Sequence, residues 1–157
     1  MGVIIRRAES ADIDSIIPLL NMVSDMHGVQ RSDVFIEHPR HISPEKLQKN
    51  ITSDKHCVIV AEHDSKIVGV MLCSIKVFKE DKKYQDSAVL SIEDTIIVDE
   101  YRGKNVSTNL LRYAIGFAKR CGCNRIESNV WSFNQRSLHW LQKNGFTIQR
   151  YVVEYPL

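Results

Sequence analysis

The chain has 157 residues and a mass of 18.0 kDa, enough to bury one hydrophobic core and short for two domains. Its 43% hydrophobic and 25% charged residues are ordinary globular values, which argue against disorder and against a membrane partner. A net charge of +2, without a basic patch interleaved with aromatic residues, argues against a nucleic-acid partner. The opening MGVIIRRAES lacks the regions of a signal peptide, so one cytoplasmic domain over residues 1–157 is expected.

The N-terminal residues predict a strand followed by a helix. Residues 3–8, VIIRRA, have the apolar and β-branched content of a strand. Ser10 is a predicted N-cap, and apolar residues recur at helical spacing after it up to about Ser24. Pro18 lies inside this predicted helix and is expected to kink it.

The segment from Met26 to His41 loses the helical period and is a candidate binding loop. A second helix is predicted from Ser43, because Pro44 then takes the first helical position, where its missing N–H costs nothing. Two apolar runs on either side of the Asp64-Ser65 turn predict a β-hairpin over residues 56–75.

The second half of the chain predicts strands and helices in alternation. The predicted strands are residues 88–100, 125–130 and 146–155. The predicted helices are residues 105–120, ended by Gly122, and Ser137–Asn144, capped by Asn134 and ended by Gly145. The order β-α-α-β-β-β-α-β-α-β predicts an α/β fold of the α+β kind, with a mixed sheet and helices on its faces.

The cysteine and histidine residues predict no metal site. The four cysteines form no C-x-x-C pair and lie in apolar segments, which favours reduced, buried thiols; they are Cys57, Cys73, Cys121 and Cys123. The six histidines contain no H-E-x-x-H motif and no close pair of the kind that binds zinc.

The stretch EYRGKNVSTNLL, residues 100–111, is basic, contains a glycine and leads directly into a predicted helix. A strand, a turn and a helix in this order direct free main-chain N–H groups at one point, where the helix dipole favours an anion such as phosphate. Arg102 and Lys104 add positive charge, while Gly103 and Asn105 tolerate left-handed backbone conformations. These residues alone fit an anion-binding turn and a plain connector equally well.

Residues 92–111 and 123–146 together resemble the GNAT superfamily of acetyl-CoA-dependent N-acetyltransferases. The family's phosphate loop, Q/R-x-x-G-x-G/A, corresponds to residues 102–107, with Asn105 and Ser107 in place of its small residues. The family's segment N-x-x-A/S-x-x-F/Y-Y-x-x-x-G-F corresponds to residues 134–146. Within the superfamily the chain looks most like small-amine acetylators related to spermidine/spermine N-acetyltransferase. The resemblance implies a mostly antiparallel sheet with helices on both faces.

The same resemblance implies acetyl-CoA as co-substrate, without a metal cofactor, and it implies which residues bind it. The residues implied for the diphosphate are Arg102, Gly103, Lys104, Asn105, Val106, Ser107 and Thr108. The pantetheine arm would bind main-chain groups of Ile96, Ile97 and Val98. Asn134 would contact the arm from the other side, or would serve only as a helix cap.

The family resemblance places the catalytic base at Glu93. An alkylamine of the lysine type has a pKa near 10.4, so a group must accept a proton before the amine can attack. In a regular strand Glu93 and Asp94 point to opposite sides, so one acid faces a given site unless a bulge intervenes. The alternative is that both acids cap the strand or form salt bridges.

The chain departs from the family at Leu141, which takes the place of the tyrosine that protonates the departing thiolate. Leucine has no proton to give, and general-acid assistance is worth about 10²- to 10⁴-fold, so a slower enzyme or a substitute donor is expected. Water, Tyr151 and Tyr155 are the candidate donors, whereas His139 projects from another helix face.

The acceptor is expected to be a primary amine of a small molecule or peptide. By analogy residues 24–41 line the acceptor side, where Asp25, Asp33 and Glu37 attract a cation or are solvated loop charges. Trp131 and Trp140 are expected to pack the sheet or a subunit contact, and a homodimer is a further possibility. The rival hypotheses are an acyl-CoA-binding or sensing module without turnover, and a plain interaction domain.

Overall fold

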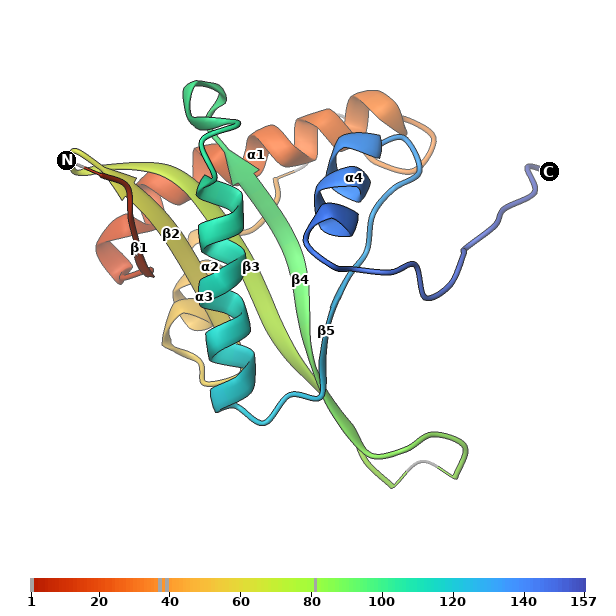
Figure 1. The fold of residues 1–157 in the computed structure, drawn as a ribbon. Coiled ribbons are helices and arrows are strands. Elements are labelled where there is room, and N and C mark those ends of the chain that lie inside the picture. The colour runs from red at the N-terminus through yellow and green to blue at the C-terminus, as the bar shows by residue number, and fades with distance from the viewer. Residues whose placement is uncertain (1, 37, 39, 81) are drawn as a thin grey trace.

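A five-stranded sheet in the order β1-β2-β3-β4-β5 organises the chain (Figure 1). The computed structural model describes all residues except 1, 37, 39 and 81. The strands are β1 Ile4–Arg7, β2 His56–His63, β3 Lys66–Phe78, β4 Ser87–Ile97 and β5 Arg125–Ser128. All neighbours pair antiparallel except β4 and β5, which are parallel. The predicted mixed, mostly antiparallel sheet is confirmed.

Helices cover both faces of this sheet, as predicted (Figure 1). The α-helices are α1 Ile13–Gln30, α2 Pro44–Thr52, α3 Val106–Arg120 and α4 Gln135–Lys143. Two short 3-10 helices are η1 Ser10–Asp12 and η2 Asp99–Tyr101. We call the side covered by α1 and α2 the α1/α2 face, and the side covered by α3 the α3 face. Within the described residues, no helix combines the length and the apolar content that crossing a bilayer demands.

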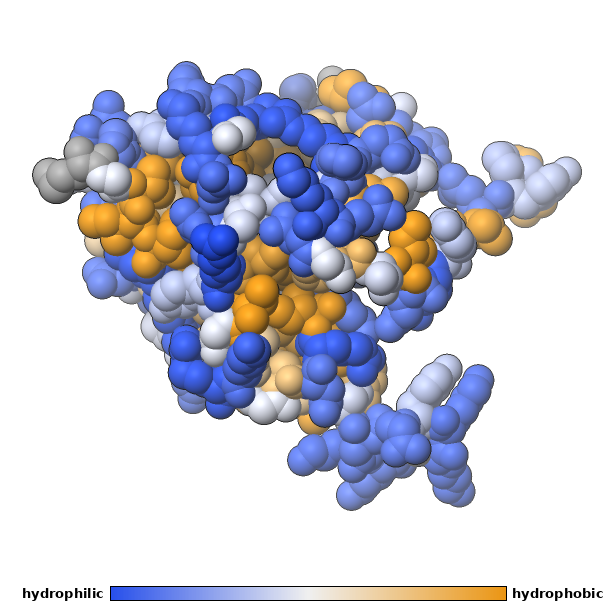
Figure 2. Space-filling view, in the orientation of Figure 1, coloured by the Kyte–Doolittle hydropathy of each residue, from blue (hydrophilic) through white to orange (hydrophobic). Residues whose placement is uncertain are grey.

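The prediction of a last strand over residues 146–155 is wrong. The chain after α4 forms no strand and projects from the body as a tail (Figures 1 and 2). Five apolar side chains near its end are more than three-quarters exposed: Tyr151, Val152, Val153, Tyr155 and Leu157. The composition is that of a strand, but a strand needs a neighbour for its hydrogen bonds, and the described residues provide none for the tail.

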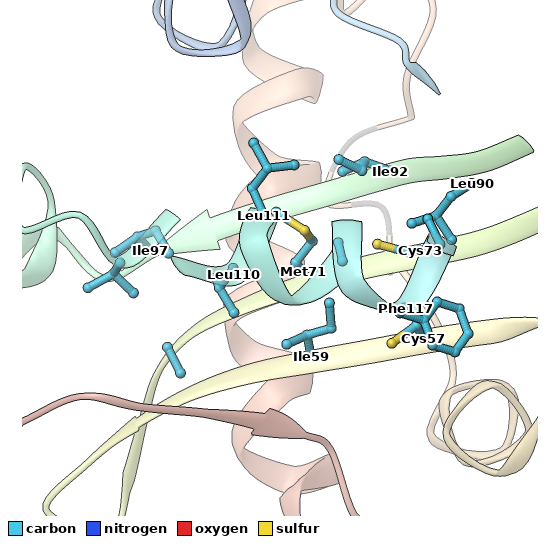
Figure 3. Packing of buried hydrophobic residues seen from close by; sticks show 14 of the residues in the cluster. Cys57, Ile59, Met71, Cys73, Leu90, Ile92, Ile97, Leu110, Leu111 and Phe117 are labelled. Atoms are coloured by element: carbon cyan, nitrogen blue, oxygen red, sulfur yellow. The ribbon is translucent and has the colours of Figure 1, made fainter. Parts of the chain in front are cut away.

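Each face of the sheet carries its own hydrophobic core. On the α3 face, strand residues such as Met71 and Leu90 pack against Leu110 and Phe117 of α3 (Figure 3). On the α1/α2 face, Leu20 and Leu47 of the two helices pack against Val58, Val70 and Leu72. α4 joins the α3 face through Trp140, and Phe146 packs beside it.

Local sequence rules correctly predicted several boundaries. Ser43 caps α2 by accepting a hydrogen bond from the Lys46 main-chain N–H at 3.2 Å. Asn134 caps α4 by accepting from the Ser137 N–H at 3.1 Å. The hairpin turn at Asp64-Ser65 is confirmed, with both residues at positive φ.

The predicted start of the first helix is wrong by two residues. Ser10 does not cap α1 but begins η1, which is organised by Asp12. The Asp12 carboxylate accepts from the Glu9 N–H at 2.8 Å and from the Arg6 guanidinium at 2.7 and 2.8 Å. Hydrogen bonding by Arg6 holds the pKa of Asp12 below its ordinary value, so this stabilisation is present above that ordinary pKa and is lost as the pH falls through the lowered pKa.

The first helix also ends later than predicted, at Gln30 instead of near Ser24. Ser24 is buried and His27 is half-buried, so polar residues occupy the inner face of the last turns. The apolar period that marks a helix in the sequence therefore stops before the helix does. The candidate binding loop shrinks to residues 31–43, of which 37 and 39 lie outside the described residues.

The prediction of buried, reduced thiols holds for two of the four cysteines. Cys57 and Cys73 are buried in the α3 face, and burial raises the pKa of the Cys57 thiol to about 11. Cys121 is exposed, because it follows the last turn of α3 and leaves the core. All four cysteines are free thiols.

Candidate active site

A β-bulge interrupts β4 at Glu93. Leu72 of β3 pairs with Asp94, but the next β3 residue, Cys73, pairs with Ile92, so Glu93 is an extra residue in β4. A bulge of this kind re-aims side chains and breaks the regular alternation of a strand. The strict alternation that would send Glu93 and Asp94 to opposite sides of the strand therefore does not hold in β4.

The bulge brings both acids to the α1/α2 face. The Ser74 hydroxyl, two residues beyond Leu72 on the same side of β3, donates to Glu93 Oε1 at 2.5 Å. Asp94 Oδ2 lies 2.9 Å from His41 Nε2, at the end of the segment that joins α1 to α2. Two consecutive carboxylates thus face one site, where a regular strand would separate them.

The edge of β4 beyond the bulge is open on the side of β5. The parallel pairing of β4 with β5 ends at Ile92 and Ser128, while β4 continues to Ile97. The Val98 N–H donates to a β3 carbonyl at 3.0 Å, so by alternation the Ile97 main-chain groups point toward the open side. The Ile97 carbonyl there accepts from Arg102 Nε at 3.1 Å. Of the three residues predicted for the pantetheine arm, Ile97 thus directs its backbone to the opening.

The turn after β4 and the first turn of α3 present a row of free main-chain donors. Within the described residues, the N–H groups of residues 103–108 donate to no acceptor of the chain. Gly103 and Asn105 both adopt left-handed conformations, with φ of 75° and 61°. Asn105 stands at the N-cap but makes no side-chain cap hydrogen bond, and the first turn of α3 holds no acid. This geometry matches an anion-binding turn better than a plain connector.

The charged side chains of the turn are partly engaged within it. Arg102 forms an ion pair with Asp99 at 2.6 Å. The Lys104 ammonium lies 5.3 Å from the centre of the Tyr101 ring. The Asp99 carboxylate thus offsets the charge of Arg102, whereas for Lys104 the described residues give only this ring contact.

Residues 22–146 match the model of the Acetyltransferase (GNAT) family, which is most of the chain. The chain belongs to this family. It is therefore an N-acetyltransferase, and its acyl donor is acetyl-CoA. No curated protein matches the chain.

Solved structures share the GNAT fold along nearly the whole chain. A mutant of the BH1408 protein from Bacillus halodurans has a TM-score of 0.93 at 23% identity, covering 98% of this chain and 99% of that one. The aminoglycoside N-acetyltransferase AAC(6')-Iy, in complex with CoA, has a TM-score of 0.77 at 18% identity, covering 99% and 95%. AAC(6')-Ih from Acinetobacter baumannii has a TM-score of 0.75 at 20% identity, covering 99% and 98%.

Two buried polar side-chain atoms on the α3 face can pair with an acyl carrier that has amide groups. Thr95 Oγ1 and Trp140 Nε1 are buried without a hydrogen-bond partner among the described residues. Both residues lie on the α3 face, Thr95 on β4 opposite Met71 and Trp140 on α4. Unpaired buried polar atoms are costly, so a ligand that pairs with them gains affinity. Asn134 uses its side-chain oxygen as the cap of α4.

An aromatic cluster links α1 to the segment between β5 and α4. Phe35 stacks on His27 at 5.5 Å and meets Trp131 edge-on at 5.6 Å, and Trp131 stacks on Phe133 at 6.2 Å. The Arg31 guanidinium lies 5.1 Å from the centre of the Trp131 ring. Sequence reasoning missed this cluster, because its two halves lie about a hundred residues apart and no motif connects them.

The three acidic residues predicted to line the acceptor side do not gather in one place. Asp25 lines a hollow of about 490 Å³ on the outer side of α1, with Val29 and Phe35. Asp33 forms an ion pair with Arg31 at 2.8 Å. Glu37 lies outside the described residues. Neither Glu93 nor the turn at 102–108 lines this hollow.

Neither candidate tyrosine takes the place of the missing general acid. Leu141 is buried at 6% exposure, and its carbonyl accepts from the Phe146 N–H. Tyr151 and Tyr155 are 80% and 86% exposed in the tail, and His139 is on the surface. Over the same residues no group of three or more His, Cys, Asp or Glu side chains is arranged to hold a metal ion.

Proposed function

We propose that the chain transfers the acetyl group of acetyl-CoA to a primary amine of a small cationic molecule. The observation that carries this proposal is the row of free N–H groups at residues 103–108, next to the open edge of β4 and the acids at its bulge. Diphosphate oxygens fit such a row of donors, which acts together with the helix dipole. The residues proposed to hold the co-substrate are those of the turn, with the main chain of Ile97 and the side chain of Asn134 along the pantetheine arm; the Val98 N–H is already bonded to β3.

In the proposed mechanism Glu93 accepts the proton that the amine must lose. When bound, acetyl-CoA supplies an acetyl thioester. The amine nitrogen forms a bond to the acetyl carbon, the carbon–sulfur bond breaks, and the nitrogen's proton passes to Glu93 directly or through water. The departing thiol has a pKa near 8.5, so its anion leaves without a general acid at Leu141, though more slowly.

Two observations support a small, cationic acceptor: the negative charge of the site and the similarity of the chain to known acetyltransferase structures. Neither Glu93 nor Asp94 forms an ion pair with a Lys or Arg within the described residues, so the site favours a cation. Several similar structures are aminoglycoside N-acetyltransferases, and one holds AAC(6')-Iy with a bisubstrate analog of CoA and acetylneamine. Aminoglycosides and polyamines both carry several amino groups, and both classes are proposed acceptors.

Coenzyme A release across a panel of amines tests the proposed activity. The panel contains aminoglycosides, spermidine, simple diamines and a lysine-bearing peptide, each with acetyl-CoA and the purified chain. We expect release above the rate without acceptor for at least one multi-amine small molecule, because the acids at the bulge attract a cation. Binding of acetyl-CoA without release for any amine would favour the sensing module, for which Leu141 is the supporting observation. Absence of both release and thermal stabilisation by coenzyme A would favour an interaction domain.

We further propose that the chain forms a homodimer through its tail. A row of apolar side chains at residues 151–157 is exposed, and among the described strands β5 stands at the edge of the sheet, paired with β4 alone. An unpaired strand pattern and an unpaired sheet edge are complementary, so the tail of one copy would pair with β5 of the other. Within one chain the tail is held by the exposed ion pair between Arg31 and Glu154.

Truncation after Arg150 tests the homodimer. Size-exclusion chromatography with light scattering is expected to show a dimer for the full chain and a monomer for the truncated one, because the exposed apolar row is removed. Thermal stabilisation by coenzyme A controls for folding and should be the same for both. A full chain that is monomeric at high concentration, or a truncated chain that stays dimeric, contradicts this proposal.

A further inference from the structure

His41 is held at three points in the interior of the α1/α2 face. Its Nδ1 lies 2.7 Å from the buried Ser24 hydroxyl, and its Nε2 lies 2.9 Å from Asp94 Oδ2. Its main-chain N–H donates to Asn21 Oδ1 at 3.2 Å. Ser24 and Asn21 belong to α1, so the histidine connects that helix to the bulge of β4.

These contacts fix the orientation of the imidazole ring relative to Asp94. An ionised carboxylate can only accept hydrogen bonds, so His41 Nε2 carries a hydrogen and donates it to Asp94. The Ser24 hydroxyl pairs with the other ring nitrogen, Nδ1. Both ring nitrogens are engaged, so the imidazole ring is held in place and orients Asp94.

Asp94 keeps one oxygen for a ligand. The Asp94 side chain is 13% exposed, and within the described residues Oδ1 accepts no hydrogen bond. Lys76 on the same face donates to Ser91 at 3.1 Å, not to either acid. Burial lowers the pKa of the neighbouring His27, so that ring adds no positive charge at neutral pH. No Lys or Arg of the described residues pairs with Asp94, so this half-buried carboxylate can still pair with a cation that a ligand supplies.

We infer that Asp94, oriented by His41, binds a second, charged amino group of the acceptor while Glu93 receives the proton from the amino group that is acetylated. The inference rests on the proposed function and names its acceptor class as molecules with at least two amino groups. The bulge is what makes this possible, because it places consecutive carboxylates on one face. Asp94 is then a specificity-determining residue, and His41 is a positioning residue that acts through it.

A comparison of matched monoamine and diamine acceptors separates the role of Asp94 from that of Glu93. Butylamine and 1,4-diaminobutane, with longer and shorter pairs of the same kind, are compared by KM and kcat in the full chain. Asp94→Asn is expected to raise KM for the diamines about 10- to 100-fold, because a charge-assisted hydrogen bond is lost. For the monoamines the KM should change by less than about twofold, since they carry no second cation. The preference for diamines therefore disappears.

Variants of His41 test the positioning role. A glutamine amide can donate from nearly the place of Nε2, so His41→Gln is expected to keep most of the diamine preference. His41→Leu leaves Asp94 without its donor and is expected to raise the diamine KM toward that of Asp94→Asn, with kcat less affected. A merely structural defect would change both acceptor classes alike. Asp54→Asn, in the exposed turn between α2 and β2, is the matched control for loss of one acidic charge and should leave the preference unchanged.

A binding measurement keeps the inference independent of turnover. Calorimetric titration of the diamines into the chain with coenzyme A should show an affinity that Asp94→Asn lowers by the same factor as its KM. Wild-type chain that binds diamines through Asp94 but releases no coenzyme A would remove the proposed function and keep this inference. Equal effects of Asp94→Asn on monoamines and diamines, or no effect on either, would overturn it.

Discussion

Replacing Glu93 by glutamine is expected to lower kcat about 10²- to 10⁴-fold at neutral pH, the usual range for loss of a general base. Glutamine keeps the size of the side chain and can still accept the Ser74 hydrogen bond, but it has no basic oxygen to take a proton. The measurement is steady-state coenzyme A release with the best acceptor of the amine panel, together with calorimetry of coenzyme A binding. The affinity for coenzyme A should stay within about twofold, because Glu93 does not belong to the turn.

The pH dependence of the Glu93→Gln deficit separates a base from a residue that only shapes the site. As the pH approaches the amine pKa near 10.4, more acceptor is already neutral, so the deficit should shrink. Glu80→Gln, in the loop between β3 and β4, removes the same charge far from the bulge and should change kcat little (Figure 1). A kcat for Glu93→Gln equal to that of wild type would remove Glu93 from the mechanism.

A carboxylate introduced at Ser107 is expected to weaken coenzyme A binding about 30-fold or more, because it places like charge against the diphosphate. Ser107 is the second residue of α3, inside the row of free N–H groups. An acid in the first turn of a helix favours the helix by about 0.3–1 kcal/mol, so the melting temperature of Ser107→Asp without ligand should not fall. The two effects have opposite signs, which a general loss of folding does not produce.

Ser107→Asn is the matched control, since it has nearly the same size as the aspartate and no charge. Its affinity for coenzyme A, measured by calorimetry beside that of Ser107→Asp, should stay close to wild type. Equal affinities in all three proteins would show that the first turn of α3 does not bind the diphosphate. A large loss in both variants would point to side-chain volume instead of charge.

Local sequence rules predicted most of the helix and turn boundaries, because the interactions that set these boundaries are local. The caps at Ser43 and Asn134 and the turn at Asp64-Ser65 depend on residues within three or four positions, which the sequence displays directly. The prediction of a last strand was wrong because strand pairing is not local. Residues 146–155 have strand composition, but pairing depends on a neighbour that the sequence of one chain does not display.

The candidate site was predictable only where its residues are contiguous. The turn at 102–108 appears in one run of sequence and was correctly placed between a strand and a helix. The bulge at Glu93 arises from the register of β3 against β4, and the contacts of His41 join residues 17 and 53 positions away. Neither leaves a local pattern, so the pairing of two carboxylates on one face could not be derived from alternation alone.

The most direct test of the account follows main-chain amide shifts of ¹⁵N-labelled protein during titration with coenzyme A. The central claim is that the unpaired N–H groups of residues 103–108 bind the diphosphate. The largest shifts are therefore expected at those amides and along the open edge of β4, and pantetheine without phosphates should leave the amides of the turn unmoved. Saturable binding with shifts confined to other parts of the chain, or no shifts at all, would contradict the account.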